Sequence, residues 1–480
     1  MSFMLVGILS ALIGGVIVAL LPEESQKLRR GIVLATCLLS ALSVWQVAAT
    51  IFSKTSPLNT LEWGIWQFRA DPLALSYALI AGTLWVLTAI YSYGYMPQDP
   101  RQRSFYAFFL LSMGITLGIA FAGNLLVLYI FYELLTFSTY PLVIHRRSEE
   151  ALRAGKKYII YSLVGAGALL VAIVATGFMA GSLSFGTGAI LDQTATSGKT
   201  VWLLILFVIG FGVKAALMPL HRWLPQAMVA PTPVSALLHA VAVVNAGVFG
   251  LLRVVYSVFG PDLLTKLGVR PYLLVLASFT VLAGSIVALR QDVLKKRLAY
   301  STISQLSYML VGAFTLSSFG LSGAIFHMLN HSIIKITLFF CAGAIEHNTG
   351  KTRVSELAGL ERTLPWTFAL FGIASLGMVG MLPVSAFWSK YYLMKAGLSS
   401  GNWPLLLVFI ISGILNACYF FPIVIQGFLG TGPIRSTEGN KETYLMLVPC
   451  ALLVVFALVL GVYPNLAWSY LVDGVVGSFF

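Results

Sequence analysis

The sequence predicts an all-α polytopic membrane protein with about fourteen transmembrane helices. Of the 480 residues, 58% are hydrophobic and only 10% are charged, and the mean hydropathy is +0.89. Soluble domains carry about 25% charged residues, so this chain has too few polar side chains to cover a water-soluble surface. Its four cysteines stand singly in apolar runs, without the spacing of a disulfide framework or a metal site.

The individual spans follow from the length that a helix needs to cross the hydrocarbon core, about 20 mostly apolar residues. The chain contains such segments at 4–22, 31–52, 72–95, 104–122, 124–144, 158–180, 200–220, 234–258, 271–289, 300–316, 321–345, 365–395, 405–428 and 443–470. Only MSF precedes the first segment, without the basic region of a secretory signal. We therefore expect the first span to remain as a helix.

The basic residues of the loops alternate between the two sides of the predicted membrane. With the N-terminus outside, twenty of them fall in inner loops, Arg435 and Lys441 included, and five fall in outer loops, namely Lys54, Arg69, Lys199, Lys266 and Arg270. Inner loops carry the excess of lysine and arginine in membrane proteins, so both termini are predicted outside. Topology thus accounts for most of the net charge of +13, and a nucleic-acid partner is not expected.

Several titratable residues lie inside the spans. An ionised group at bilayer depth costs at least ~2.5–3.5 kcal/mol on insertion scales, so it normally faces a partner or water. Arg253 is near enough to a span end to reach the interface by snorkelling. One carboxylate cannot neutralise three buried lysines, which favours a chain of titratable groups over a packing contact between two helices. The buried set is Glu133, Lys214, His239, Lys335 and Lys390.

The segment FHMLNHSIIKITLFF places Lys335 and two further histidines on one helix face. His327, His331 and Lys335 follow one another at intervals of four residues, which is about 6 Å along a helix. Imidazole titrates near neutrality, and such a stripe can pass a proton through intervening waters. The alternative is a polar stripe that only satisfies one neighbouring helix.

Prolines interrupt two of the spans beside buried lysines. Pro219 follows Lys214 by five residues, and Pro383 precedes Lys390 by seven. Proline opens a helix and frees backbone carbonyls, which a membrane tolerates only where protein or a wet cavity covers them. Paired interrupted helices in two halves of a chain indicate a transport site built from inverted repeats.

Long motifs around these residues resemble a known family. KAALMPLHRWLPQAMVAPTPVSALLHAVAVVNAGVFGLLR, ALRQDVLKKRLAYSTISQLSYML, FHMLNHSIIKITLFFCAGAIEH, FYELLTFSTYPLV and LPVSAFWSKYYL are similar to the proton-translocating antiporter-like subunits shared by respiratory complex I, Mrp cation/proton antiporters and membrane-bound hydrogenases. The resemblance covers roughly residues 70 to 430. It implies two inverted five-helix repeats, each with a broken helix, at 104–258 and 259–430. Residues 1–103 would supply three further helices and 431–480 the last.

The resemblance also implies roles for the buried residues. Glu133 and Lys214 resemble the charged pair of the first half-channel, and Lys390 resembles the terminal lysine of the second. His327, His331 and Lys335 resemble the connection between the halves. Many relatives carry another lysine in the eighth span, where this chain has Asn245. The L-type subunits use the preceding histidine, which corresponds to His239, so we assign the bridging role to His239 and a water-binding role to Asn245.

The expected function is that of a proton-translocating subunit in a prokaryotic cytoplasmic membrane. Because L-type subunits continue into a long lateral helix while this chain stops at Phe480, an Mrp D-type subunit or its counterpart in a hydrogenase or related ferredoxin-linked complex is favoured. An M- or N-type subunit of complex I is the alternative. Expected partners are other membrane subunits, including further antiporter-like ones, and the expected substrates are protons, with Na⁺ left open.

No cofactor or metal site is expected, so any redox chemistry belongs to a partner, and whether the assembly is an enzyme depends on the host complex. Two other classes remain to be separated. A stand-alone cation or solute transporter would need a carboxylate cluster, whereas Glu133 stands alone in the bilayer. A scaffold subunit that no longer conducts would not be expected to keep Glu133 and three buried lysines.

Overall fold

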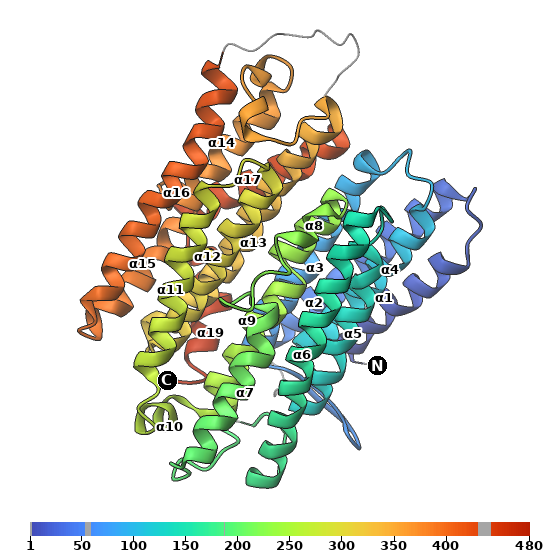
Figure 1. Cartoon of the computed structure of the whole chain (residues 1–480). Coiled ribbons are helices and arrows are strands. Elements are labelled where there is room, and N and C mark those ends of the chain that lie inside the picture. The colour runs from blue at the N-terminus through green and yellow to red at the C-terminus, as the bar shows by residue number, and fades with distance from the viewer. Residues whose placement is uncertain (1, 53–58, 187, 431–442) are drawn as a thin grey trace.

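The computed structural model describes residues 2–52, 59–186, 188–430 and 443–480 (Figure 1). Lys54, Arg435 and Lys441, which entered the charge analysis, lie outside the described residues. Within them, eleven helices are long and apolar enough to cross a membrane. The other predicted spans correspond to α7 (Gly198–Lys214), α12 (Leu294–Phe314) and the pair α14 (Pro365–Val379) and α15 (Ala386–Ser399). The prediction of an all-α polytopic membrane protein is confirmed.

The remaining helices follow the predicted order along the chain. They are α1 (Phe3–Leu20), α2 (Gln26–Phe52), α3 (Pro72–Tyr95), α4 (Gln102–Ala120), α5 (Leu125–Val143), α6 (Glu149–Ala180), α8 (Thr232–Ala240), α9 (Val243–Arg253), α10 (Pro261–Lys266), α11 (Arg270–Leu289), α13 (Ser318–Thr349), α16 (Trp403–Leu429) and α17 (Tyr444–Val462), with short turns α18 (Asn465–Ala467) and α19 (Asp473–Val476) after them. α7 ends at Lys214 and α17 at Val462, both earlier than predicted.

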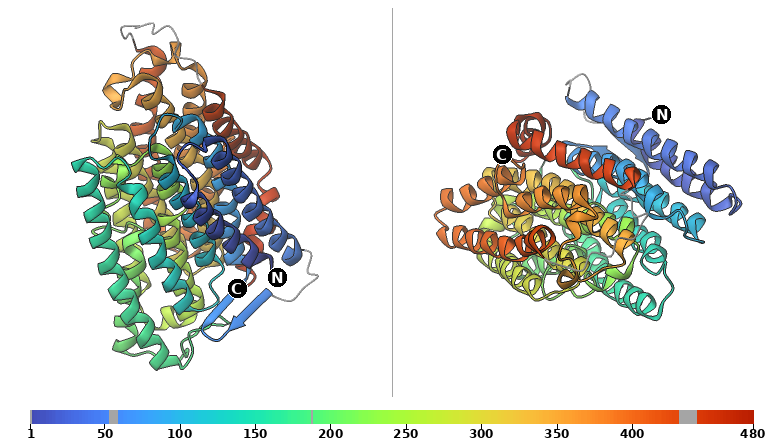
Figure 2. Two further views of the ribbon diagram at one scale, coloured as in Figure 1. Left: turned by 90° about the vertical axis from the view of Figure 1, so that its right-hand side faces the viewer. Right: turned by 90° about the horizontal axis from the view of Figure 1, so that it is seen from above.

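The centre of the bundle is α13, the helix that carries the histidine and lysine stripe. It contacts α3, α8, α12, α14, α15 and α17. The most apolar stretch of α13 is entirely buried, and so is that of the segment Thr232–Phe259. Seen from above, α1 and α2 (dark blue) and α15 and α16 (orange) lie at opposite edges of the molecule (Figure 2). The polar residues of α13 are therefore enclosed by protein.

Both predicted helix interruptions are present. After α7 the chain runs without α-helix until α8, apart from the 3₁₀ turn Gln226–Val229, and the buried Trp223 indole donates to the Val213 carbonyl at 2.8 Å. Between α14 and α15 the helix stops at Gly380, whose φ of 95° suits glycine. Each interruption lies beside a lysine, as the proline positions predicted.

The eighth span, predicted as continuous over 234–258, contains a third interruption. α8 ends at Ala240 and α9 begins at Val243, and a π-helical turn, Val254–Phe259, follows α9. The Tyr77 hydroxyl donates to the Ala242 carbonyl at 2.8 Å, and the Asn245 amide donates to the Ala240 carbonyl at 2.8 Å. These side chains satisfy carbonyls that an apolar environment would otherwise leave unpaired.

A β-hairpin, for which the sequence analysis made no prediction, precedes α3. Strands β1 (Asn59–Trp63) and β2 (Trp66–Ala70) pair antiparallel around Gly64, whose φ of 60° glycine adopts without steric cost. The hairpin projects from the end of the bundle near which both termini lie (Figure 2). Termini at one end are consistent with an even number of spans.

Arg253 does not snorkel, and that expectation is wrong. Its side chain is 1% exposed, and its guanidinium donates to both carboxylate oxygens of Asp71, at 2.7 and 2.8 Å. Burial opposes ionisation of this carboxyl, but Arg253, the Ala74 backbone amide and Arg69 together outweigh burial and hold its pKa below the usual range. The pair ties the end of β2 and the start of α3 to α9.

Candidate functional site

Lys214 closes α7 with its ammonium directed at α5. The side chain is 1% exposed, and Nζ donates to the backbone carbonyl of Tyr132. The same atom lies 3.5 Å from the centroid of the Tyr132 ring, a cation–π geometry that favours a desolvated ammonium. The carbonyl and the ring of Tyr132 together hold the Lys214 ammonium beside the residue that precedes Glu133 in α5.

Glu133 is the partly buried carboxylate of α5. It interacts electrostatically with Lys214, but no direct ion pair joins the two in the described part of the chain. The oxygen Oε1 of Glu133 is buried and has no hydrogen-bond partner. A buried carboxylate oxygen requires a donor, so this atom is placed to receive either a water or the lysine ammonium.

A glycine on α9 brings the end of α7 against the interrupted eighth span. A Cβ added at Gly247 would lie 2.2 Å from the Ala215 nitrogen and 2.7 Å from the Lys214 carbonyl carbon. Both atoms are backbone, so no side-chain movement could relieve the clash. The absence of a side chain at Gly247 therefore places Lys214 beside the helix that carries Asn245.

His239 and Asn245 flank the interruption of the eighth span. Both ring nitrogens of the fully buried His239 lack a hydrogen-bond partner, and its ring lies 5.2 Å from that of Phe339 on α13. Asn245 donates from Nδ2 to the Ser332 hydroxyl on α13 at 2.9 Å, whereas its buried Oδ1 has no partner. Both residues thus face α13. The ring nitrogens of His239 and Oδ1 of Asn245 are buried polar atoms to which a water molecule could bind.

The stripe on α13 lies on one buried face, as the spacing predicted. His327 is hydrogen-bonded on both sides, to Ser389 of α15 at 2.9 Å and to Gln305 of α12 at 3.0 Å. Its ring stacks at 6.4 Å on that of His331, whose two nitrogens have no partner. Lys335 donates to the Ser301 hydroxyl at 2.7 Å. The stripe therefore connects α12, α13 and α15.

Lys390 folds back from α15 onto the end of α14. Its Nζ donates to the carbonyls of Met378 at 2.5 Å and Val379 at 3.1 Å. These are carbonyls of the last helical turn, which carries the negative end of the helix dipole. A Cβ at Gly380 would lie 2.7 Å from Cδ of Lys390. The absence of a side chain at Gly380 therefore leaves room for the methylene groups of Lys390.

The sequence analysis missed the neutral partners of the charged residues. Tyr132, Ser301, Gln305, Tyr308 and Ser389 all contact a buried lysine or histidine of the set. Three of them, Ser301, Gln305 and Tyr308, recur at intervals of four and three residues within α12. A polar stripe at helical spacing in an otherwise apolar span is a signal that could have identified that face.

Several buried polar atoms of the site have no hydrogen-bond partner in the described structure. Among the described residues, no group of three histidines, cysteines or carboxylates could hold a metal ion. The partnerless nitrogens of His239 and His331 and the oxygens of Glu133 and Asn245 are instead buried polar atoms, and such atoms in membrane interiors are normally satisfied by water.

Two family models match the chain. The first, described as NADH:quinone oxidoreductase/Mrp antiporter, TM, matches residues 122–416. The second, NADH-Ubiquinone oxidoreductase (complex I), chain 5 N-terminus, matches residues 65–106. Together they cover the second strand of the hairpin, all the residues of the site and the interrupted helices.

Curated relatives include NADH-quinone oxidoreductase subunit N of Desulforudis audaxviator, 34% identical over 83% of this chain and 81% of the relative. Na(+)/H(+) antiporter subunit A1 of Staphylococcus aureus is 28% identical over the whole chain, which spans 63% of the length of that relative.

Two solved structures have the same fold. A chain of the membrane-bound sulfane sulfur reductase, an archaeal respiratory membrane complex, has a TM-score of 0.89 and 26% identity, with 100% of this chain and 98% of that chain covered. A chain of the Mrp complex from Dietzia sp. also has a TM-score of 0.89, at 20% identity, with 100% and 97% covered.

Proposed function

This chain belongs to the NADH:quinone oxidoreductase/Mrp antiporter family, as an antiporter-like proton-translocating subunit of a multisubunit membrane complex, and on that premise we propose the path of the proton. The proton moves sideways through the bundle, from Lys214 by way of His239 to Lys335 and on to Lys390. Asn245, His327 and His331 hold or orient the waters and hydrogen bonds between these stations. The observation that carries the proposal is the set of buried, partnerless polar atoms between the lysines.

The switch in this proposal is the distance between Lys214 and Glu133. When the carboxylate reaches the ammonium, Coulomb attraction in a weakly polar site holds the proton on the lysine. When the ammonium instead contacts only the neutral carbonyl and ring of Tyr132, as it does here, it is held less strongly than by a carboxylate, and the proton transfers more readily toward His239. A neighbouring subunit that moves Glu133 would therefore drive the transfer.

The host complex and the division of the chain follow from the same premise. We assign the two inverted repeats to 104–258 and 259–430, with 1–103 and 431–480 as the flanking helices. Each repeat then contains one of the two proline-associated interruptions. An Mrp-type or hydrogenase-type complex with further antiporter-like subunits is the proposed host, with Na⁺ as a second candidate substrate. The similarity to subunit N favours complex I as the alternative host.

The cell location is also part of the proposal. We propose the cytoplasmic membrane of a prokaryote with both termini outside, and the bias of lysine and arginine between the loops supports this orientation. Protons would enter from the cytoplasmic side and leave near Lys390. The hairpin β1–β2 would then face the outside.

Proton flux in proteoliposomes that contain the complex tests the switch. Glu133→Gln and Lys214→Ala should both reduce driven proton uptake to the level of protein-free liposomes, because each removes one charge of the pair. Lys157→Gln, which removes an exposed charge on α6, is the matched control and should leave the flux unchanged.

The variants must first be shown to assemble, by co-purification of the partner subunits in wild-type ratios. Given assembly, wild-type flux in either Glu133→Gln or Lys214→Ala would reject the proposed switch. Expression of the chain alone addresses the competing view of a stand-alone transporter. Ion transport without any partner subunit would favour that view.

A further inference from the structure

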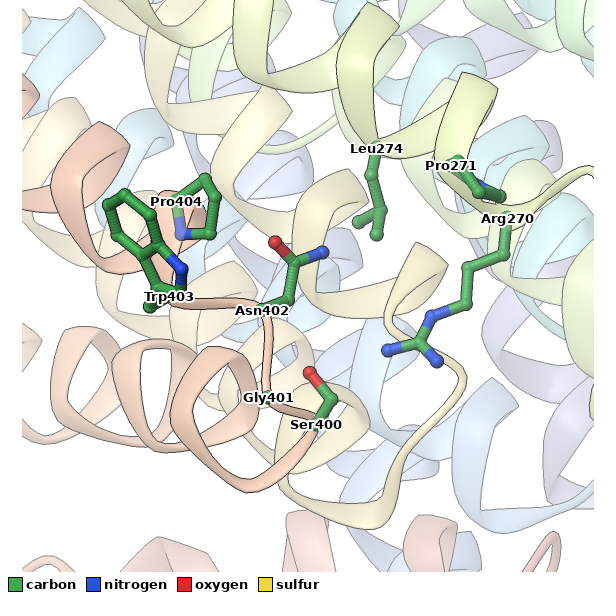
Figure 3. Close-up of a pocket in the computed structure, with 8 residues that line it drawn as sticks. All are labelled: Arg270, Pro271, Leu274, Ser400, Gly401, Asn402, Trp403 and Pro404. Carbon is green, nitrogen blue, oxygen red and sulfur yellow. The ribbon is translucent and has the colours of Figure 1, made fainter.

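A surface hollow lies at one end of the bundle, away from the buried site. It has a volume of about 460 Å³ and is lined by the first turn of α11 and by the connection between α15 and α16 (Figure 3). Its polar lining consists of Arg270, Ser400 and Asn402, and its apolar lining includes Leu274 and Trp403. None of these residues takes part in the proposed proton path.

Arg270 is a cation without a partner at this hollow. It is half-buried, its Nε is buried without a hydrogen-bond partner, and no carboxylate of the described chain pairs with it. It is also one of the few basic residues on the predicted outer side, where the positive-inside rule disfavours them. Topology therefore does not account for an arginine at this position.

The other donors around the hollow favour an anion. Figure 3 shows the guanidinium of Arg270, the amide of Asn402 and the hydroxyl of Ser400 bordering the same space. The Ser400 hydroxyl already donates to the Ala396 carbonyl at 2.8 Å, whereas the Asn402 side chain makes no capping bond to α16. Arg270 and Asn402 are thus the free donors, and a guanidinium matches two oxygens of a phosphate.

The surroundings indicate that the phosphate belongs to a lipid. Tyr272 and Trp403, the aromatic residues beside the hollow, are 77% and 63% exposed, and such side chains gather at the membrane interface. Farther along α11 and α16, Phe279 and Ile414 are exposed at 61% and 60%. A phosphate at the hollow would therefore lie above apolar helix surface that acyl chains can cover.

We propose that Arg270 and Asn402 bind the phosphodiester headgroup of an anionic membrane lipid in this hollow. The guanidinium takes two phosphate oxygens, the amide donates to a third, and the acyl chains run along α11 and α16. The site is independent of the proton path, since none of its residues belongs to that path.

Native mass spectrometry of the purified full chain, titrated with phosphatidylglycerol, tests the site. Arg270→Gln should weaken binding at least about tenfold, as expected for the loss of one two-pronged guanidinium–phosphate contact. Arg270→Lys keeps the positive charge but loses the two-pronged guanidinium contact, so its affinity should lie between those of the wild type and Arg270→Gln. Lys199→Gln removes an exposed positive charge from the same predicted side and should bind as the wild type does.

Thermal unfolding without lipid shows whether the variants are folded. If Arg270→Gln does not fold, Asn402→Ala takes its place, because this variant is also expected to bind phosphatidylglycerol less tightly. Equal affinity of wild type and the folded variants for phosphatidylglycerol would overturn the site. So would equal binding of zwitterionic phosphatidylethanolamine. If millimolar inorganic phosphate displaces phosphatidylglycerol from the wild type, the hollow is a site for free phosphate and the lipid assignment is wrong.

Discussion

At the scale of single residues, the buried histidines differ in how they are held. His327 is fixed between Gln305 and Ser389, whereas the nitrogens of His239 and His331 have no partner in the described structure. A fixed histidine orients its neighbours, and a histidine open to water can accept and release a proton. His239 is thus suited to be the bridge between Lys214 and Lys335.

The bridge can be tested by exchanging its parts. His239→Ala should abolish driven proton uptake in proteoliposomes, because it removes the titratable group between the two lysines. Asn245→Lys introduced into the same variant should restore part of the uptake, since the new ammonium would start from a position that faces Ser332 on α13. If His239→Ala transports at the wild-type rate, or if Asn245→Lys changes nothing in that background, His239 is not the bridge.

Asp99 provides a pH-dependent contact outside the spans. Burial acts to raise the pKa of its carboxyl, but the hydrogen bond from His145, at 3.0 Å, the hydrogen bond from the Arg101 backbone amide, at 2.8 Å, and the nearby positive charge together outweigh burial and lower it. The stabilisation is therefore complete above the unfolded pKa of about 3.9 and is lost as the pH falls through the lower folded value. In detergent, thermal stability should decline more between pH 5 and 3 in the wild type than in Asp99→Asn. Parallel curves would contradict this role.

At the scale of elements, the interruptions were predictable only where proline marks them. Pro219 and Pro383 identified two of them from the sequence, together with the lysines beside them. The third, at Val241–Ala242, lies in a run of β-branched and small residues with no proline or glycine. The break is stabilised by two side chains. The Tyr77 hydroxyl comes from a distant part of the sequence, and the Asn245 amide lies close by but does not by itself indicate a break. Long-range contacts of this kind have no local signal.

The hairpin and the Arg253 contact were missed for related reasons. A search for 20-residue apolar spans passes over two five-residue strands, although LEWGIWQF contains a glycine turn between aromatic residues. The partner of Arg253 lies 182 residues away, so a single sequence could suggest only snorkelling. The stripe on α13 was predictable because it depends on one helix alone.

The Asp71–Arg253 pair should lock the hairpin end of the bundle. Asp71→Asn leaves a buried guanidinium unpaired, which typically costs about 3–5 kcal/mol, so thermal unfolding in detergent should begin at a clearly lower temperature. Asp71→Asn combined with Arg253→Met removes both charges and should recover part of the loss. An unchanged unfolding temperature in Asp71→Asn would show that the pair contributes nothing.

At the scale of the whole molecule, charge and hydropathy predicted the number of spans, and the structure places both termini at one end of the bundle (Figure 2). The side of the membrane remains a prediction. An impermeant thiol reagent should label Ile65→Cys, at the tip of the hairpin, in intact cells, with the four native cysteines replaced. Glu150→Cys, at the start of α6, should react only after permeabilisation. The reverse labelling would invert the topology and, with it, the proposed proton inlet.

A cryo-EM map of the complex that resolves ordered water tests the central claim most directly. The account predicts a continuous series of waters that joins Lys214, His239, Lys335 and Lys390 and reaches the free nitrogens of His239 and His331. A dry, apolar gap between any two of these lysines, in every conformational class of the particles, would contradict it.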